Sequence, residues 1–178
     1  MKRSLITLCC FAVTLLFTTQ IHAQQRTSRA SQLNQNPSAK QKQALYRAAD
    51  RGQKRVQALR IPVVAPTRSA NTAGKRRPTL QQMKKAYLRK CAEIKQTRGN
   101  VTAAQYKKFQ SDFARLEKDL DQHVRMHFAD PGNQKGSQFS DCYNDCHTSF
   151  PGIGGGAGAN RFACKFGCFV EATGGRNN

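Results

Sequence analysis

The sequence predicts an all-α fold, in which a helical hairpin and a second, disulfide-stapled helical hairpin follow a basic, largely disordered arm. Three observations carry this prediction. Apolar residues recur every three or four positions through the middle of the chain, as they do on one face of an amphipathic helix. Two Cys-x3-Cys motifs follow near the C-terminus. Nearly all of the formal net charge of +20 lies before residue 91.

Residues 1–23 have the pattern of a cleavable signal peptide. A basic start, an apolar run from Leu5 to Phe17 and a small residue, Ala23, are the three parts of that pattern. The apolar run is too short to span a bilayer comfortably, so cleavage is preferred over a retained anchor. We therefore expect export to a periplasm or out of the cell, where disulfides form, with cleavage near Ala23.

Residues 24–78 are expected to form a basic, largely disordered arm and linker. From Gln24 to Lys90 the chain has seventeen Lys and Arg side chains and one acidic side chain, Asp50. Large apolar residues are too sparse in the arm to offset the entropy that ordering would cost. A thin apolar stripe between Ser38 and Arg60 predicts only a transient helix, which could become ordered on a partner.

Residues 79–130 are predicted to form an antiparallel helical hairpin. Thr79 can cap the first helix, Gly99 and Asn100 would end it, and Thr102 begins a capping box for the second. The second helix has apolar residues at spacings of three or four, which are Tyr106, Phe109, Phe113, Leu116, Leu120 and Val124. Two amphipathic helices on a short turn pack their apolar faces together.

Residues 131–178 are predicted to form a second hairpin with one cysteine motif on each helix. The helices should run roughly from Ser137 to Thr148 and from Ala159 to Ala172, joined by a flexible glycine-rich loop. Residues four apart lie on one face of a helix, so each helix can present two thiols to the other. In antiparallel helices the outer cysteine of one pairs with the far cysteine of the other. This predicts two nested disulfides, Cys142–Cys168 and Cys146–Cys164.

The twin motif, over residues 138–171, resembles the Cys-x3-Cys hairpins of the α-hairpinin peptides and of the small mitochondrial intermembrane-space chaperones. The resemblance is one of cysteine spacing. It implies a stapled hairpin with its two bridges. It indicates neither a partner nor an activity for this chain. The signal peptide and the glycine-rich loop of this chain depart from both families.

Two alternatives use the same cysteines. Cys142-x3-Cys146-His147 is one residue longer than the usual c-type haem attachment signature, and it would make the protein an electron carrier with His147 as an iron ligand. The four thiolates of the twin motif could instead form a tetrahedral zinc site. Disulfides account for all four cysteines in an oxidising compartment, so no metal or cofactor is assigned.

Cys91 is left over by this pairing. It lies on the predicted core side of the first helix of residues 79–130. It is expected to be either a buried thiol or the link of a disulfide-bonded homodimer. The sequence shows no set of nucleophile, base and orienting group, so an enzyme is not predicted and no small-molecule substrate is inferred.

The basic arm is the main indication of function. A polycation outside the cytoplasm meets anionic partners such as an envelope surface, a polysaccharide or a nucleic acid. We therefore expect a non-enzymatic interaction protein. The densest expected contacts to a polyanion are Arg47, Arg51, Lys54, Arg55, Lys75, Arg76 and Arg77.

The aromatic C-terminal segment suggests a competing function. In this alternative the protein is a membrane-active, bacteriocin- or toxin-like molecule whose glycine-rich, aromatic C-terminus disrupts membranes. Under the preferred interpretation, the same aromatic residues could offer the stapled hairpin a contact face. These residues are Phe150, Phe162, Phe166 and Phe169.

Overall fold

The computed structural model describes residues 36–61, 78–129 and 137–174. Its ordered elements there are helices, which confirms the all-α fold class. They are α2 (Ala39–Ala58), α3 (Leu80–Gln96), α4 (Ala103–Ala129), α5 (Ser137–Ser149) and α6 (Gly155–Ala172). The predicted signal peptide and the parts of the arm at 24–35 and 62–77 lie outside the described residues.

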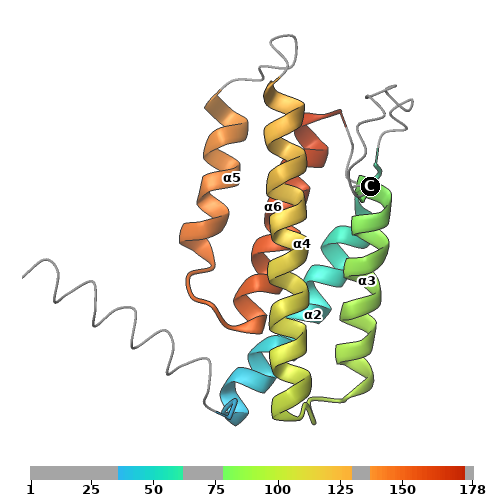
Figure 1. Ribbon diagram of the computed structural model, residues 1–178, viewed down its shortest axis with the longest axis vertical. Coiled ribbons are helices and arrows are strands. Elements are labelled where there is room, and N and C mark those ends of the chain that lie inside the picture. Colours follow the sequence, from blue (N-terminus) through green and yellow to red (C-terminus); the bar gives the residue numbers. More distant parts are fainter. Residues whose placement is uncertain (1–35, 62–77, 130–136, 175–178) are drawn as a thin grey trace, which may run out of the picture. The chain divides into compact units, whose positions relative to one another are not determined.

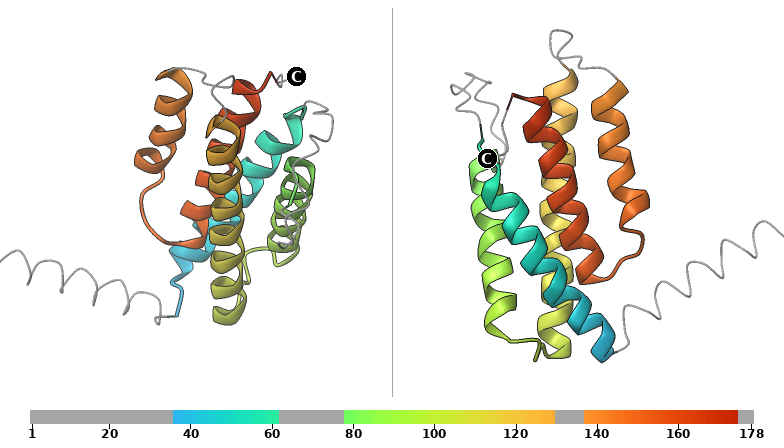
Figure 2. Two further views of the ribbon diagram at one scale, coloured as in Figure 1. Left: turned by 45° about the horizontal axis from the view of Figure 1, so that its top comes forward. Right: turned by 180° about the vertical axis from the view of Figure 1, so that it is seen from behind.

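Helix α6 is the centre of the structure. It contacts α2, α4 and α5, and α3 in turn contacts α2 and α4. Figure 1 shows α4 in front of α6, with α5 on one side and α3 on the other. Seen from behind in Figure 2, α2 crosses obliquely between α3 and α6. The two predicted hairpins therefore share one core, because α4 and α6 pack together across the boundary expected near residue 131.

Capping boxes begin three of the helices. The side chains of Ser38, Thr79 and Thr102 each accept a hydrogen bond from the backbone N–H of a glutamine three residues later, and that glutamine accepts one in return. These bonds satisfy N–H groups that the first turn of a helix leaves unpaired. Gly99, at φ +86°, turns the chain between α3 and α4. The predicted caps at Thr79 and Thr102 and the predicted turn are thus confirmed.

Helix α2 corrects the expectation that this part of the arm is only transiently ordered. Leu45, Ala48, Ala49 and Val56 are fully buried in the core. The expectation weighed only the apolar content of the arm itself. Packing against α3 and α6 supplies the burial that α2 could not obtain alone.

Small residues allow α2 and α6 to approach closely. The facing positions are Gly155 with Leu45, Gly156 with Ala44, Ala163 with Gly52, and Gly167 with Arg55. From the first two pairs to the last, the residue numbers increase on both helices, so α2 and α6 run in the same direction. A β-carbon at Gly156 would lie 3.1 Å from the backbone carbonyl group of Ala44. The glycines at 155–158 were expected in a flexible loop. All three belong to α6 instead, where they are buried against α2 and α4.

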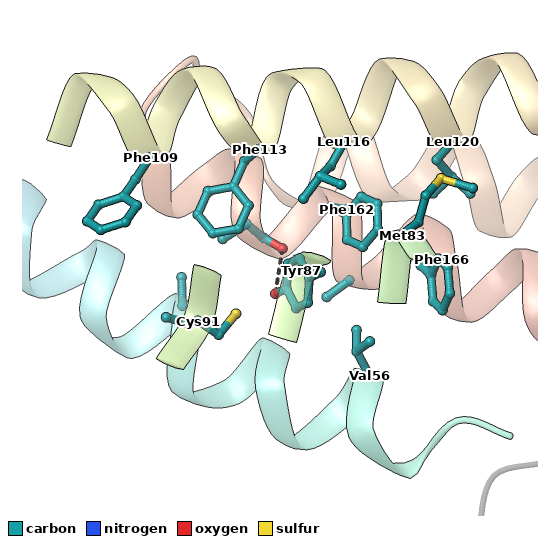
Figure 3. Packing of buried hydrophobic residues seen from close by; sticks show 14 of the residues in the cluster. Val56, Met83, Tyr87, Cys91, Phe109, Phe113, Leu116, Leu120, Phe162 and Phe166 are labelled. Carbon is teal, nitrogen blue, oxygen red and sulfur yellow. Dashed lines mark hydrogen bonds between the residues drawn. The ribbon is translucent and has the colours of Figure 1, made fainter. Parts of the chain in front are cut away.

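Tyr87 of α3 lies where four helices meet. Its hydroxyl donates a hydrogen bond to the carbonyl oxygen of Ala159 in α6, at 3.0 Å. Its ring centroid lies 5.6 Å from that of Phe113 in α4 and 4.8 Å from that of Phe162 in α6. Figure 3 shows these three side chains in the core. Gly52 completes the contact from α2, because a β-carbon there would lie 1.9 Å from the Tyr87 hydroxyl oxygen. The Tyr87 hydroxyl can therefore reach its hydrogen-bond acceptor only because residue 52 of α2 has no side chain.

The aromatic residues of α6 do not form the predicted contact face. Phe162, Phe166 and Phe169 are fully buried, and only Phe150, before α6, is partly exposed. The sequence analysis expected α6 to pack only against α5, in a separate two-helix hairpin. Because α2, α4 and α5 all pack on α6, its aromatic positions belong to the core.

Gly52→Ala is expected to destabilise the protein, because the new methyl group overlaps the Tyr87 hydroxyl. Overpacking of this kind costs about 1–3 kcal/mol. Tyr87→Phe alone should cost about 0.5–1.5 kcal/mol through its lost hydrogen bond. In the double variant the glycine substitution should cost less than in the parent, because removal of the hydroxyl makes room for the methyl group. Chemical unfolding of the four proteins measures this, and strictly additive costs would contradict the contact.

Candidate functional site

Four of the seven residues predicted to bind a polyanion lie on the exposed side of α2. We call Arg47, Arg51, Lys54 and Arg55 the basic face; all four are exposed. Successive helical residues turn by about 100°. Arg47, Arg51 and Lys54 therefore lie opposite the buried stripe around Leu45 and Val56, and Arg55 lies at the edge of that stripe. The other three predicted residues, 75–77, lie outside the described part of the chain.

The basic face is poorly neutralised. Asp50 is the acidic residue of α2, and its carboxylate lies 3.0 Å from Lys54 Nζ and 3.0 Å from Lys95 Nζ of α3. Hydrogen bonds from these two lysines lower the pKa of Asp50. Within the described residues, no acidic side chain lies at ion-pair distance from the three arginines of the face. Their charge is therefore available to a partner.

Contacts at the C-terminal end of α2 hold the face in place. Lys84 of α3 donates hydrogen bonds from Nζ to the carbonyl oxygens of Leu59, at 2.6 Å, and Gln57, at 3.3 Å. A cation at this position suits the negative end of the helix dipole. Burial lowers the pKa of Lys84. The guanidinium of Arg55 covers Gly167 of α6, where a β-carbon would lie 3.4 Å from Nε. The orientation of the face thus depends on both neighbouring helices.

A second group of charges lies where α4, α5 and α6 meet. Lys165 is 1% exposed, and its Nζ lies 2.9 Å from Glu117 Oε1 and 3.0 Å from Asp121 Oδ1. The Tyr143 hydroxyl donates to the same Asp121 oxygen, and its ring lies beneath the ammonium, 4.9 Å from the centroid. We call these four residues the buried ionic cluster. Burial, followed by the bond to Asp121, raises the pKa of Tyr143.

Arg161 and His147 extend the cluster to the loop between α5 and α6. Arg161 Nε lies 3.2 Å from both carboxylate oxygens of Glu117, and its Nη1 donates to the carbonyl oxygens of Phe150 and Gly152. His147 Nε2 lies 3.7 Å from Glu117 Oε1. Two acidic side chains of α4 thus face two basic side chains of α6. Pairing of this kind offsets the cost of removing charged groups from water. The arrangement positions α5 and the loop.

The predicted disulfides are present as Cys142–Cys168 and Cys146–Cys164. They join α5 to the central helix, in addition to the ring contacts of Phe139 with Phe128 and Phe169. The alternative of haem attachment would use Cys142 and Cys146, and both are bonded to α6. Thioether formation would therefore require both bridges to be reduced first.

Cys91 is a buried free thiol on α3. Burial raises its pKa to about 12, although a hydrogen bond with Tyr87 acts in the opposite direction. A thiol of this kind is protonated at neutral pH and reacts slowly. A disulfide with a second chain would require this part of the core to open.

The buried ionic cluster was not predicted, although the sequence holds a signal for it. Glu117 and Asp121 are like charges four residues apart on α4, and Arg161 and Lys165 are like charges four apart on α6. Such pairs destabilise an isolated helix. An acidic pair on one helix and a basic pair on another therefore indicate that the two helices pack together and neutralise each other's charge.

Comparisons of the chain with protein-family models, with curated proteins and with solved structures find no match. Among the described helices, none has the length and apolar character needed to cross a membrane.

Intact mass spectrometry with a thiol-alkylating reagent should confirm the cysteine assignments in the chain from Gln24. Native protein is expected to take up almost no label, because Cys91 is buried and protonated. Unfolding without a reductant should give one label, and unfolding with a reductant should give five. A Cys91→Ser control should take none before reduction. A dimer mass, or several labels before reduction, would contradict the assignment.

Lys165→Met is expected to destabilise the protein, because it leaves Asp121 and Glu117 close together without their shared cation. Breaking a buried pair costs about 3–5 kcal/mol, and the lower end applies because Asp121 is partly exposed. Adding Glu117→Gln should recover part of the loss. Lys118→Met, on the exposed side of α4, is the matched control and should change the free energy of unfolding by about 0.5 kcal/mol or less. Equal losses at positions 118 and 165 would be the contrary result.

Proposed function

We propose that the protein is an exported, non-enzymatic interaction protein that binds an anionic partner through the basic face of α2. One observation supports this most directly: exposed arginines that form no ion pair with another described residue lie on an ordered helix that two other helices hold in place. The two disulfides also fit this proposal, because they are typical of proteins that fold in an oxidising compartment.

The chemistry of the face suits a polymer that carries phosphate, sulfate or carboxylate groups. Arg47, Arg51 and Arg55 are four residues apart, so their α-carbons rise by about 6 Å per step along the helix. Guanidinium groups bind such anions through paired N–H donors. Affinity of this kind comes largely from counterion release and falls steeply with salt.

An ordered face has an advantage over a disordered arm of the same charge. Ordering a chain on its partner consumes part of the interaction free energy. In α2 this cost is already met by folding, since Leu45, Ala48 and Val56 anchor the helix in the core. The predicted basic residues at 75–77 would add further charge to the same interaction.

The proposal is tested with the disulfide-bonded chain from Gln24 and with random-sequence duplex DNA as the probe polyanion. Binding is measured over a range of salt concentrations in Arg47→Gln/Arg51→Gln/Lys54→Gln. Each lost phosphate contact reduces the slope of log K against log salt by about 0.9. A slope reduced by about 2–3 is therefore expected for this variant.

The matched control is Lys108→Gln/Arg115→Gln/Lys118→Gln, which removes three exposed charges from α4. It should change the slope by less than one. Equal changes in both variants would mean that net charge alone drives binding, and unchanged binding in the α2 variant would exclude its basic face. Heparin in place of DNA separates a general polyanion site from one restricted to nucleic acids.

A further inference from the structure

Two histidines lie side by side near the C-terminal end of α4. His123 and His127 are four residues apart, so they share one face of the helix, with their β-carbons about 5–6 Å from each other. Both rings pack against Phe169 of α6. Their centroids lie 5.6 Å and 5.3 Å from that of Phe169, and both rings are nearly perpendicular to it. This shared contact holds the two imidazoles next to each other.

The ring nitrogens of this pair can bind a metal ion without breaking another contact. Both side chains are half-buried, so part of each ring stays open to solvent. In the described part of the chain their contacts are ring contacts, and no hydrogen bond or ion pair engages them. His147 of α5 differs, because its Nε2 lies 3.7 Å from Glu117 Oε1. Two histidines four apart on a helix face are the arrangement by which helical zinc sites hold their ion.

Met126 places a sulfur atom beside the pair. It lies three residues after His123, so the two side chains are neighbours on the helix surface. Because successive residues turn by about 100°, Met126 and His127 flank His123 on opposite sides. Met126 is 44% exposed, and the rotatable bonds of a methionine allow its thioether to reach a neighbouring group. One turn of α4 thus presents two imidazoles and a thioether together.

These three ligands suit copper, and Cu⁺ in particular. Thioethers select soft ions and imidazoles also bind copper, whereas hard cations require carboxylate or carbonyl oxygens. Asp119 shares this helix face, but it lies eight residues from His127, about 12 Å along the helix, too far to join both histidines on one ion. The cysteines of α5 and α6 are bonded to each other, so they do not compete for the metal. We propose that His123, Met126 and His127 bind a single Cu⁺.

The test uses the disulfide-bonded chain from Gln24, with Cu⁺ kept reduced by ascorbate without air and bicinchoninate as the competing chelator. The parent should bind one Cu⁺ per chain. His123→Gln and His127→Gln should each weaken binding at least about 10-fold, because loss of a group that only orients a metal ligand already costs about 10–100-fold. Met126→Leu, which keeps the volume of the side chain, should weaken Cu⁺ binding by a similar factor.

The matched controls are His147→Gln, which removes the other histidine of this chain, and Cys91→Ser, which removes its free thiol. Both should bind Cu⁺ as the parent does. Circular dichroism checks that each variant keeps its helices, and Met126→Leu keeps the test valid if a histidine variant unfolds, because Met126 is outside the core. Absence of binding at one Cu⁺ per chain in the parent would overturn the proposal. So would an equal loss in His147→Gln, or unchanged binding in Met126→Leu.

Discussion

The hydrogen bond from Tyr87 to the carbonyl oxygen of Ala159 is the interaction on which the packing of the other helices depends. A buried hydroxyl without a partner is costly, so α3 and α6 must stay at this distance. The space beside the hydroxyl exists only because residue 52 is glycine. This hydrogen bond therefore sets the spacing of α3 and α6. It also restricts the residue at position 52 of α2 to glycine.

The position of α2 decides how its charges are presented. A helix with such a thin apolar stripe needs a close approach to another helix to bury enough surface. Gly155, Gly156 and Ala163 provide that surface on α6. Once Leu45 and Val56 are buried, the basic face can only be directed to solvent. On the far side of α6, the buried ionic cluster and the disulfides hold α5, so the central helix has an apolar side and a polar side.

Much of the fold could be predicted from the sequence, where the information is local. Thr79 and Thr102 mark their helices through contacts three residues away, and the spacing of four within each cysteine motif predicts both bridges. The order of α2 was not predictable in this way, because Gly52 and Gly156 favour neither helix nor burial by themselves. Likewise, four of the seven residues predicted to bind a polyanion lie on α2, a segment that was expected to be only transiently helical. Their shared face depends on α6, which lies far away in the sequence.

The contact between Tyr87 and Ala159 joins residues 72 positions apart, and α2 faces α6 from further still. Pairings so distant in sequence form late, because the intervening chain must be closed into a loop first. During synthesis, α2 emerges well before α6, which buries it. The core cannot close until the last residues are available. The chain therefore stays open along most of its length until its synthesis is nearly complete.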